Sequence, residues 1–319
     1  MRNEAFVALD HNIVVLVGGV GGAKLALGLQ MILPPEQLTV IVNTGDDFWH
    51  YGLRICPDID TVLYTLSGRV DPVNGWGLAD DSRVVLQSLA DYGENTWFGL
   101  GDKDIATHLL RTHMLRNGHS LSEVIDHLAK AQGIQSAILP MTNDPVPTIV
   151  ETAEYGELAF QEYFVKYRWQ PTVTGLRYQD IEQASLNPAV TSALQNADMI
   201  LFGPSNPWLS IEPILSVPGM RDTLLACDVP RVAVTPIVDG QAIKGPAAKL
   251  MAELGYDDVS AQNVAKHYGQ IINGFVYDKS DAAFHVDALH TIGMDTIMKN
   301  NADKARLAQQ MLAWIKEWT

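Results

Sequence analysis

Four aspartates lie within fifteen residues of one another, and their spacing is suited to metal-dependent chemistry on a phosphate compound. They are Asp46, Asp47, Asp58 and Asp60, in the stretch NTGDDFWHYGLRICPDID. The stretch follows LTVIVN at 38–43, which is typical of a buried parallel strand, and doubly wound sheets bind ligands at the carboxyl ends of such strands. Magnesium prefers oxygen ligands and commonly takes one or two carboxylates together with substrate phosphate oxygens. We therefore predict Asp46 and Asp58 as magnesium ligands.

Each of the other charged residues in this stretch has a second interpretation. Asp47 is compatible with a solvated position, and Asp60 with the first turn of a following helix, where it would face the positive end of the helix dipole. Arg54 is placed either to pair with a carboxylate or to reach a phosphate, and the sequence does not decide between the two.

A glycine-rich turn precedes this acidic stretch, in VVLVGGVGGAKLALGL at 14–29. The pattern predicts a strand at 13–18 and a helix at 22–33. It is not a P-loop, because Lys24 follows Ala23 and precedes Leu25, and it is not a dinucleotide fingerprint, because Lys24 occupies the last glycine position. Glycines before a helix N-terminus still let the backbone approach a phosphate closely. The alternative is a turn that only packs tightly, and Lys24 either faces the phosphate or balances charge on the helix.

Two further segments combine polar groups with a preceding apolar run. FGPSNPWLSIEPIL at 202–215 offers donors at Ser205, Asn206 and Ser210, for an anion or nucleotide contact or for a simple turn. WFGLGDKDIATHLLR at 97–111 joins aromatic surface to polar side chains, which favours either a pocket for a flat aromatic ligand or a buried helix start. Those side chains are Asp102, Asp104, Thr107, His108 and Arg111.

The composition limits the partners and the compartment. The chain has 319 residues, of which 47% are hydrophobic, and a net charge of −15, which argues against nucleic-acid and anionic-membrane partners. Cys56 and Cys227 suggest neither a disulfide framework nor a zinc site, so we expect a reducing cytoplasm. The start, MRNEAFVALDHN, lacks the basic flank of a signal peptide, and glycines and Lys24 interrupt the next apolar run, which disfavours a membrane span.

These segments must be positioned by an α/β fold. Strand, glycine turn, helix and strand over about thirty residues form a βαβ unit and imply a mainly parallel sheet flanked by helices. Residues 60–134 read as a helical insertion subdomain, with a capping box from Ser120 to Glu123. Strand patterns return at 135–139, 148–152, 156–168, 197–207, where the strand runs into a polar turn, and 229–238, and 302–319 is an amphipathic helix. We predict one α/β domain over 1–319.

Several long motifs together resemble one family. GGVGGAKLALGL, NTGDDFWHYGLRICPDIDTVLYTLSG, WGLADDS, WFGLGDKDIATHLLRTHMLRNGHSLSEV, FGPSNPWLSIEPIL and GPAAKLMAELG occur in this order over 14–255. They are similar to the 2-phospho-L-lactate transferase family of coenzyme F-420 biosynthesis. The resemblance implies a Rossmann-like fold with a helical insertion, a magnesium requirement and a homodimer. It also implies transfer of a phosphorylated three-carbon acid from its guanosine diphosphate-activated form to the terminal hydroxyl of the deazaflavin Fo, with release of GMP.

The resemblance also implies roles for individual residues. It matches Asp46 and Asp58 to the metal. As a separate hypothesis from the chemistry of the transfer, Asp47 or Asp60 accepts the proton of the attacking hydroxyl. On the nucleotide side the resemblance matches the glycines and the turn that follows the later strand, namely Gly19, Gly21, Gly22, Gly203, Ser205 and Asn206. On the Fo side it matches Asp102, Thr107 and His108. Whether the donor carries lactate, enolpyruvate or glycerate is left open.

The main alternative is a non-catalytic regulator that binds a nucleotide sugar or a dinucleotide. Such a protein would keep the glycine turn and the GPSNP turn. It would not need the paired acids or the aromatic segment 97–111, so their presence favours the enzyme. A dehydrogenase is less well supported, because the dinucleotide fingerprint fails.

Overall fold

The structure is a computed structural model that describes residues 11–318. Most of the N-terminal stretch considered above for a signal peptide lies outside these residues. Within the described part of the chain, no helix is both long enough and apolar enough to cross a membrane.

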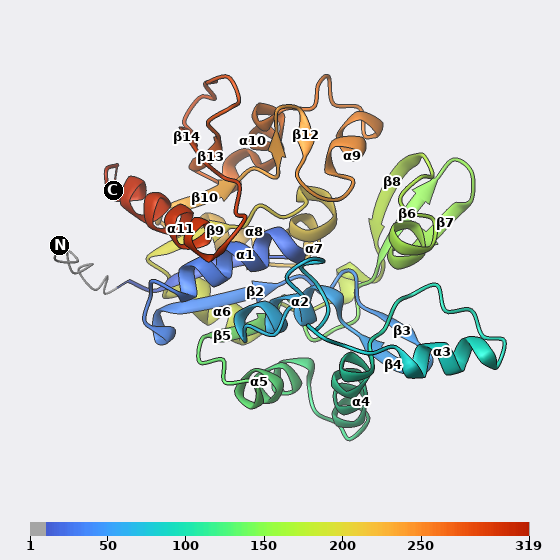
Figure 1. Cartoon of the computed structure of the whole chain (residues 1–319). Coiled ribbons are helices and arrows are strands. Elements are labelled where there is room, and N and C mark those ends of the chain that lie inside the picture. Colours follow the sequence, from blue (N-terminus) through green and yellow to red (C-terminus); the bar gives the residue numbers. More distant parts are fainter. Residues whose placement is uncertain (1–10, 319) are drawn as a thin grey trace.

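A seven-stranded sheet forms the centre of the molecule, in the order β14-β13-β10-β9-β1-β2-β5, and every neighbouring pair is parallel (Figure 1). The predicted α/β class is therefore confirmed. The chain passes from β1 to β2 on one side and reaches β9 on the other side much later, so the order reverses at β1 and opens a crevice there. The strands are β1 (Ile13–Val17), β2 (Leu38–Val42), β5 (Ala137–Pro140), β9 (Met199–Phe202), β10 (Arg231–Val234), β13 (Gly274–Asp278) and β14 (His290–Met294).

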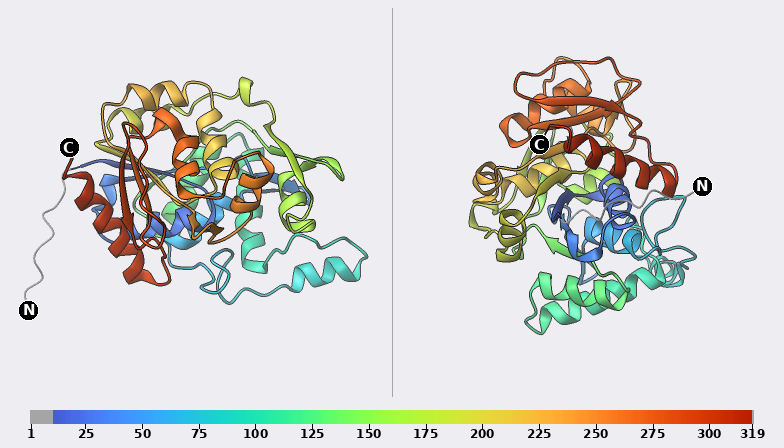
Figure 2. Two further views of the ribbon diagram at one scale, coloured as in Figure 1. Left: turned by 90° about the horizontal axis from the view of Figure 1, so that it is seen from above. Right: turned by 90° about the vertical axis from the view of Figure 1, so that its left-hand side faces the viewer.

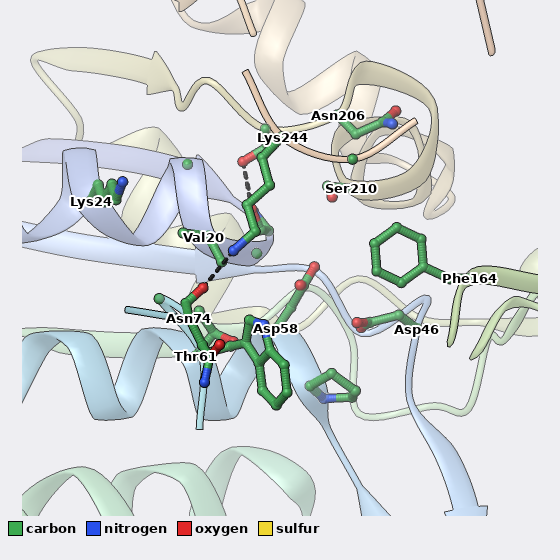
Figure 3. Close-up of a pocket in the computed structure, with 18 of the residues that line it drawn as sticks. Val20, Lys24, Asp46, Asp58, Thr61, Asn74, Phe164, Asn206, Ser210 and Lys244 are labelled. Atoms are coloured by element: carbon green, nitrogen blue, oxygen red, sulfur yellow. Dashed lines mark hydrogen bonds between the residues drawn. The ribbon is translucent and has the colours of Figure 1, made fainter. Parts of the chain in front are cut away.

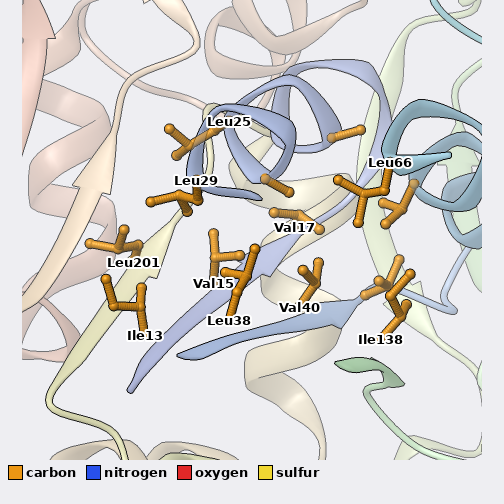
Figure 4. Packing of buried hydrophobic residues seen from close by; sticks show 14 of the residues in the cluster. Ile13, Val15, Val17, Leu25, Leu29, Leu38, Val40, Leu66, Ile138 and Leu201 are labelled. Atoms are coloured by element: carbon orange, nitrogen blue, oxygen red, sulfur yellow. The ribbon is translucent and has the colours of Figure 1, made fainter. Parts of the chain in front are cut away.

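Helices cover both faces of this sheet, and the alternation along β1 shows which residues face which layer. Val15 and Val17 pack with one set of helices (Figure 4). Val14 and Leu16 belong to a second buried cluster on the opposite face. The first set is α1 (Gly19–Gln30), α2 (Pro57–Leu66), α5 (Leu121–Ala131) and α11 (Asn301–Ile315); the second is α6 (Pro188–Gln195), α7 (Glu212–Ser216), α8 (Met220–Ala226), α9 (Ala247–Glu253) and α10 (Ala261–Tyr268). Helix α1 packs against both α2 and α11 (Figure 2).

The chain between β2 and β5 carries the segments that frame the crevice. A short hairpin of β3 (Phe48–His50) and β4 (Leu53–Ile55) leads into α2, and α3 (Val84–Asp91) and α4 (Asp102–Arg116) follow before α5. The capping box from Ser120 to Glu123 is present at the start of α5, as predicted. Helix α3 projects from the body of the molecule (Figures 1 and 2).

A second, antiparallel sheet adjoins the crevice, and here one prediction is partly wrong. The sheet consists of β7 (Gly156–Ala159), β6 (Thr148–Thr152) and β8 (Val173–Tyr178). The strand predicted over 156–168 ends at Ala159, and Glu162–Lys166 instead forms a π-helical turn. The turn matters because it brings Gln161 and Phe164 to the crevice. A small hairpin of β11 (Ile237–Val238) and β12 (Gln241–Ala242) lies before α9.

Candidate active site

A cavity of about 680 Å³ opens where β1, β2 and β9 end, at the reversal of strand order. Its walls come from segments far apart in the sequence: the start of α1, the turn after β2, the first turns of α2, residues 72–77, α4, the π-helical turn after β7, the turn after β9, and the segments before α9 and α11 (Figure 3). The cavity is large enough for a ligand of several rings.

The glycines form the beginning of a helix rather than a loop. Helix α1 starts at Gly19, three residues earlier than predicted, with Gly18 as N-cap, no side-chain cap and no acid in its first turn. A Cβ on Gly18 would lie 2.4 Å from Asp58 Oδ2, and one on Gly21 would lie 2.2 Å from the carbonyl oxygen of Pro204. Gly18 therefore gives room to the Asp58 carboxylate, and Gly21 lets the helix touch the turn after β9. The glycines therefore pack tightly against Asp58 and Pro204, and they also place the N-terminus of α1 at the cavity.

Asp46 and Asp58 face the cavity and are both buried. Asp46 lies in the turn after β2, and Asp58 lies in the first turn of α2, where it accepts hydrogen bonds from Asn43 Nδ2 at 2.9 Å and from the Gly19 N–H. Gln161 Nε2 lies 3.5 Å from Asp46 Oδ2, and Asp46 Oδ1 is a buried oxygen without a hydrogen-bond partner among the described residues.

The electrostatics of this pair fit a cation. Burial, followed by repulsion from Asp58, raises the pKa of Asp46 well above its ordinary value, and burial raises the pKa of Asp58 to about 6. In the described part of the chain, no basic side chain lies within ion-pair distance of either carboxylate. Arg54 pairs with Asp47 instead, and Arg111 pairs with Asp60. Two neighbouring buried carboxylates, one of which has an oxygen without a hydrogen-bond partner among the described residues, suit a hard divalent cation such as magnesium.

The other two aspartates of the stretch pair with arginines. Arg54 Nη2 lies 3.2 Å from Asp47 Oδ2, so Arg54 pairs with a carboxylate. Asp47 does not line the cavity. Burial outweighs this arginine and raises the pKa of Asp47 to about 6. Arg111, fully buried on α4, donates to both carboxylate oxygens of Asp60. Asp60 lines the cavity, but its charge is already balanced.

Arg111 also contacts a second group of possible metal ligands and supplies the positive charge beside them. Oxygen and nitrogen atoms of Asp60, Asp104 and His108 lie within 4.8 Å of one another. Arg111 Nη1 is 3.0 Å from His108 Nδ1, so this nitrogen accepts and the hydrogen is on Nε2. A guanidinium thus supplies the positive charge here. Tyr64 completes this wall by donating to Asp104 Oδ1 at 2.6 Å.

Of the residues predicted on the Fo side, one lines the cavity and two lie away from it. His108 lines the cavity, whereas Asp102 and Thr107 do not. Asp102 accepts hydrogen bonds from Ser82 Oγ at 2.6 Å and from the Val84 N–H at 3.0 Å, so it holds the start of α3.

On the predicted nucleotide side, the turn after β9 is tied directly to the start of α1. Ser205 Oγ donates to the Gly18 carbonyl at 2.7 Å and accepts from the Gly18 N–H at 3.0 Å. Asn206 lines the cavity, its Oδ1 caps the following turn, and its buried Nδ2 has no hydrogen-bond partner among the described residues. Gly19, Gly21, Ser205 and Asn206 line the cavity, whereas Gly22 and Gly203 pack against each other behind it.

The sequence predictions missed three residues of the site. Asn43 orients Asp58, Gln161 approaches Asp46, and Lys244 reaches over the start of α1 (Figure 3). Asn43 stood in the quoted strand but had no visible role. Gln161 was hidden in a segment assigned to a strand, and the segment around Lys244 carried no pattern that linked it to the first helix.

Comparisons with known proteins agree with this geometry. The family model described as "2-phospho-L-lactate transferase CofD" matches residues 13–316. The chain belongs to the CofD family. This membership makes it a transferase with a role in coenzyme F-420 biosynthesis. It confirms the family resemblance seen in the sequence.

Relatives of this CofD-family protein carry two different names. It is 40% identical over 300 residues to the 2-phospho-L-lactate transferase of Methanosarcina mazei, covering 93% of this chain and 98% of that one. It is 43% identical over 275 residues to the phosphoenolpyruvate transferase of Streptomyces griseus, covering 85% and 86%. A solved structure of a UPF0052-family protein from Bacillus halodurans has a TM-score of 0.61 at 16% identity, over 95% of this chain and 98% of that one, which supports the fold.

Proposed function

We propose that this protein transfers a phosphorylated three-carbon acid from its guanosine diphosphate-activated form to the terminal hydroxyl of Fo, with release of GMP. The observation that carries the proposal is the position of Asp46 and Asp58. These two carboxylates lack a basic partner in the described chain and line the same cavity as the N-terminus of α1, whose Gly19 N–H donates to Asp58. An acidic pair beside a helix N-terminus suits a metal-bound diphosphate.

The nucleotide would occupy the side of the cavity formed by α1 and the turn after β9. Gly19, Val20 and Gly21 of the first turn of α1 line this side of the cavity, where the positive end of the helix dipole would favour the phosphates. Asn206 also lines it, and its Nδ2, which has no partner among the described residues, would serve as a donor for the nucleotide. Asp46 and Asp58 would hold magnesium, which when bound neutralises the diphosphate and stabilises charge on the departing GMP. Asn43 and Gln161 keep the two carboxylates in place.

Fo would occupy the aromatic side of the cavity. Phe160 and Phe164 stack at a centroid distance of 5.4 Å, and Phe164 lies beside Asp46 (Figure 3). Tyr64, Trp76 and Phe98 line the cavity from the insertion. Fo bound with its ring against these side chains would extend its side chain, with the terminal hydroxyl, toward the part of the cavity lined by Asp46 and Asp58.

The residues of the chain then act mainly by positioning the acceptor hydroxyl and the activated phosphate relative to each other. We assign a proton-acceptor role to neither Asp47 nor Asp60, because Arg54 and Arg111 pair with them. A loose phosphoryl transition state requires little help from a base, and fixed donors and the cation supply most of the stabilisation.

The test is direct product detection. Purified protein is incubated with Fo, magnesium and each of three donors, carrying lactate, enolpyruvate or glycerate, and the Fo adduct and GMP are measured by mass spectrometry. We expect an adduct with one donor and a loss of at least about 100-fold in Asp46→Asn and Asp58→Asn. Asp126→Asn, on the exposed face of α5, is the matched control. No adduct with any donor would support the non-catalytic binding alternative instead.

We further propose that the protein works as a homodimer in the cytoplasm. Both cysteines are free, which suits a reducing compartment. Light scattering after size exclusion tests the dimer, and fractionation of the source cells tests the compartment.

A further inference from the structure

A chain of polar side chains lies outside the cavity, next to the turn after β9. Trp208, the second residue of the π-helical turn Pro207–Ile211, is buried and does not line the cavity. Its Nε1 donates to the Tyr256 hydroxyl at 3.2 Å, and this hydroxyl lies 2.8 Å from His267 Nδ1. His267 Nε2 faces Glu212 Oε2 at 3.5 Å. We call Trp208, Tyr256, His267 and Glu212 the tryptophan network.

The chemistry of these groups fixes the direction of the hydrogen bonds. An indole nitrogen can only donate, so the Tyr256 hydroxyl accepts from Trp208 and directs its own hydrogen to His267 Nδ1. The imidazole hydrogen is then on Nε2, toward Glu212. Burial opposes the charge on Glu212, but His267 and Arg221 outweigh it and lower the pKa of Glu212. Each member therefore orients the next, and the network closes because Glu212 directly follows the turn that contains Trp208.

The backbone of Trp208 is bonded to a residue that lines the cavity. The N–H groups of Trp208 and Leu209 donate to Asn206 Oδ1 at 3.0 and 3.1 Å. This cap occupies the amide oxygen, and the buried Nδ2 of Asn206 is left without a partner among the described residues. Asn206, Leu209 and Ser210 line the cavity, and Figure 3 shows Asn206 and Ser210 on this turn. A displacement of Trp208 would thus change the orientation of the Asn206 amide.

The turn needs support from other elements because its backbone geometry is uncommon. The Ile211 N–H reaches back five residues to the Asn206 carbonyl at 3.2 Å, and such π-helical turns are rare and frequent at functional sites. A second tyrosine also holds Trp208, since the Tyr178 hydroxyl on β8 donates to the Trp208 carbonyl at 2.6 Å. Trp208 is therefore held through its backbone and its side chain by residues 30 and 48 positions away.

We propose that the tryptophan network positions Asn206 for the nucleotide, so that Tyr256 and His267 are positioning residues of the transfer that touch neither substrate. The inference rests on the proposed function for the identity of the ligand on this side of the cavity. The two carboxylates on the metal side are held by residues outside the network. Loss of the network should therefore weaken binding of the activated donor and leave the chemical step and the binding of Fo nearly unchanged.

Steady-state kinetics of variants that each remove one group test the proposal. Tyr256→Phe removes both hydrogen bonds of the hydroxyl with little change in volume. We expect the KM for the activated donor to rise at least about tenfold in this variant, whereas kcat and the KM for Fo stay within about threefold. Trp208→Phe should have the same effect. In the double variant the two losses should not add, because both substitutions remove the same hydrogen bond.

A conservative replacement and a matched control separate positioning from a general loss of stability. His267→Asn keeps an amide oxygen that can accept near the position of Nδ1, and it should recover part of the donor affinity that His267→Leu loses. Tyr268→Phe is the control. Tyr268 is the neighbour of His267 on α10, it is buried, and its hydroxyl has no hydrogen-bond partner among the described residues. Its loss should leave both KM values unchanged.

Three results would overturn the proposal: a donor KM in Tyr256→Phe within about twofold of wild type, a fall in kcat without a change in donor KM, or an equal rise in donor KM in Tyr268→Phe. If Trp208→Phe fails to fold, Tyr178→Phe, which frees the Trp208 carbonyl, takes its place.

The outcome is separate from the transferase test, because calorimetry with GDP and magnesium measures the same effect without turnover. We expect Tyr256→Phe to bind GDP at least about tenfold more weakly than wild type, and Tyr268→Phe to bind it equally well. Weaker GDP binding by Tyr256→Phe, without any Fo adduct from wild type, would refute the proposed function alone. Adduct formation with an unchanged donor KM in Tyr256→Phe would refute the role of the network alone.

Discussion

Replacing Asp58 with asparagine should stabilise the metal-free protein, although it should abolish transfer. Asp58 is buried beside Asp46, and burial raises its pKa to about 6 from an ordinary value of 3.8. A raised carboxyl pKa means that the folded protein keeps a proton that the unfolded chain releases. Stability is therefore lost as the pH rises from about 3.8 to about 6, and the full cost applies above pH 6.

The magnitude follows from the shift. A difference of about 2 pKa units corresponds to roughly 3 kcal/mol at pH 8. Asparagine removes the charge but has one acceptor oxygen in place of two. Asn43 Nδ2 and the Gly19 N–H would then compete for that oxygen, which costs about 1 kcal/mol. We expect a net gain of about 2 kcal/mol at pH 8, and a gain that disappears by about pH 4.

Urea unfolding in EDTA at pH 8 and at pH 4, followed by circular dichroism, measures this difference. Magnesium should stabilise wild type, by about 2.7 kcal/mol at a hundred times its dissociation constant, and should have little effect on Asp58→Asn. The exposed control Asp126→Asn should stay within about 0.5 kcal/mol of wild type under both conditions. The reasoning is refuted if Asp58→Asn is less stable than wild type at pH 8 in EDTA, or if magnesium stabilises both proteins equally.

Three further substitutions test the scaffold by urea unfolding. Gly21→Ala should cost about 2–3 kcal/mol, because its Cβ would lie 2.2 Å from a backbone oxygen, whereas Gly99→Ala, with its nearest neighbour at 3.7 Å, should cost under about 1 kcal/mol; equal losses would contradict this. Arg111→Met should cost about 3–5 kcal/mol by leaving Asp60 buried and unpaired, and Arg111→Lys should recover part of it. Ser120→Ala removes the capping box of α5 and should cost about 1 kcal/mol; no change would mean that the cap contributes nothing.

The sequence was most informative where a pattern depends on neighbouring residues. The run from Ile13 to Val17 forms β1, and LTVIV forms β2 parallel to it, because short β-branched runs next to a glycine turn have few other uses. Ser120 and Glu123 form their capping box within one helical turn. Such features need no knowledge of distant contacts, so they could be predicted.

Predictions failed where distant contacts override the local pattern. The alternation over 156–168 continues past Ala159, yet the chain turns there, and Phe160 and Phe164 stack at the cavity instead of extending the strand. Similarly, α1 begins at Gly19 because the turn after β9 packs closely against Gly21. Glycine propensity disfavours a helix there, and tertiary packing prevails.

The four aspartates of the opening stretch show most clearly what the sequence could not decide. They look equivalent in sequence, but two arginines divide them: Arg54 neutralises Asp47 within the same hairpin, and Arg111 reaches Asp60 from α4. Only the first of these pairs is close in sequence, and the second joins residues 51 positions apart. The pairing leaves Asp46 and Asp58 as the aspartates of this stretch without an ion-pair partner, and both face the cavity. The place where a cation is needed is thus set by where the arginines are, and exchanging Arg111 for an uncharged residue should extend the unbalanced negative charge to Asp60.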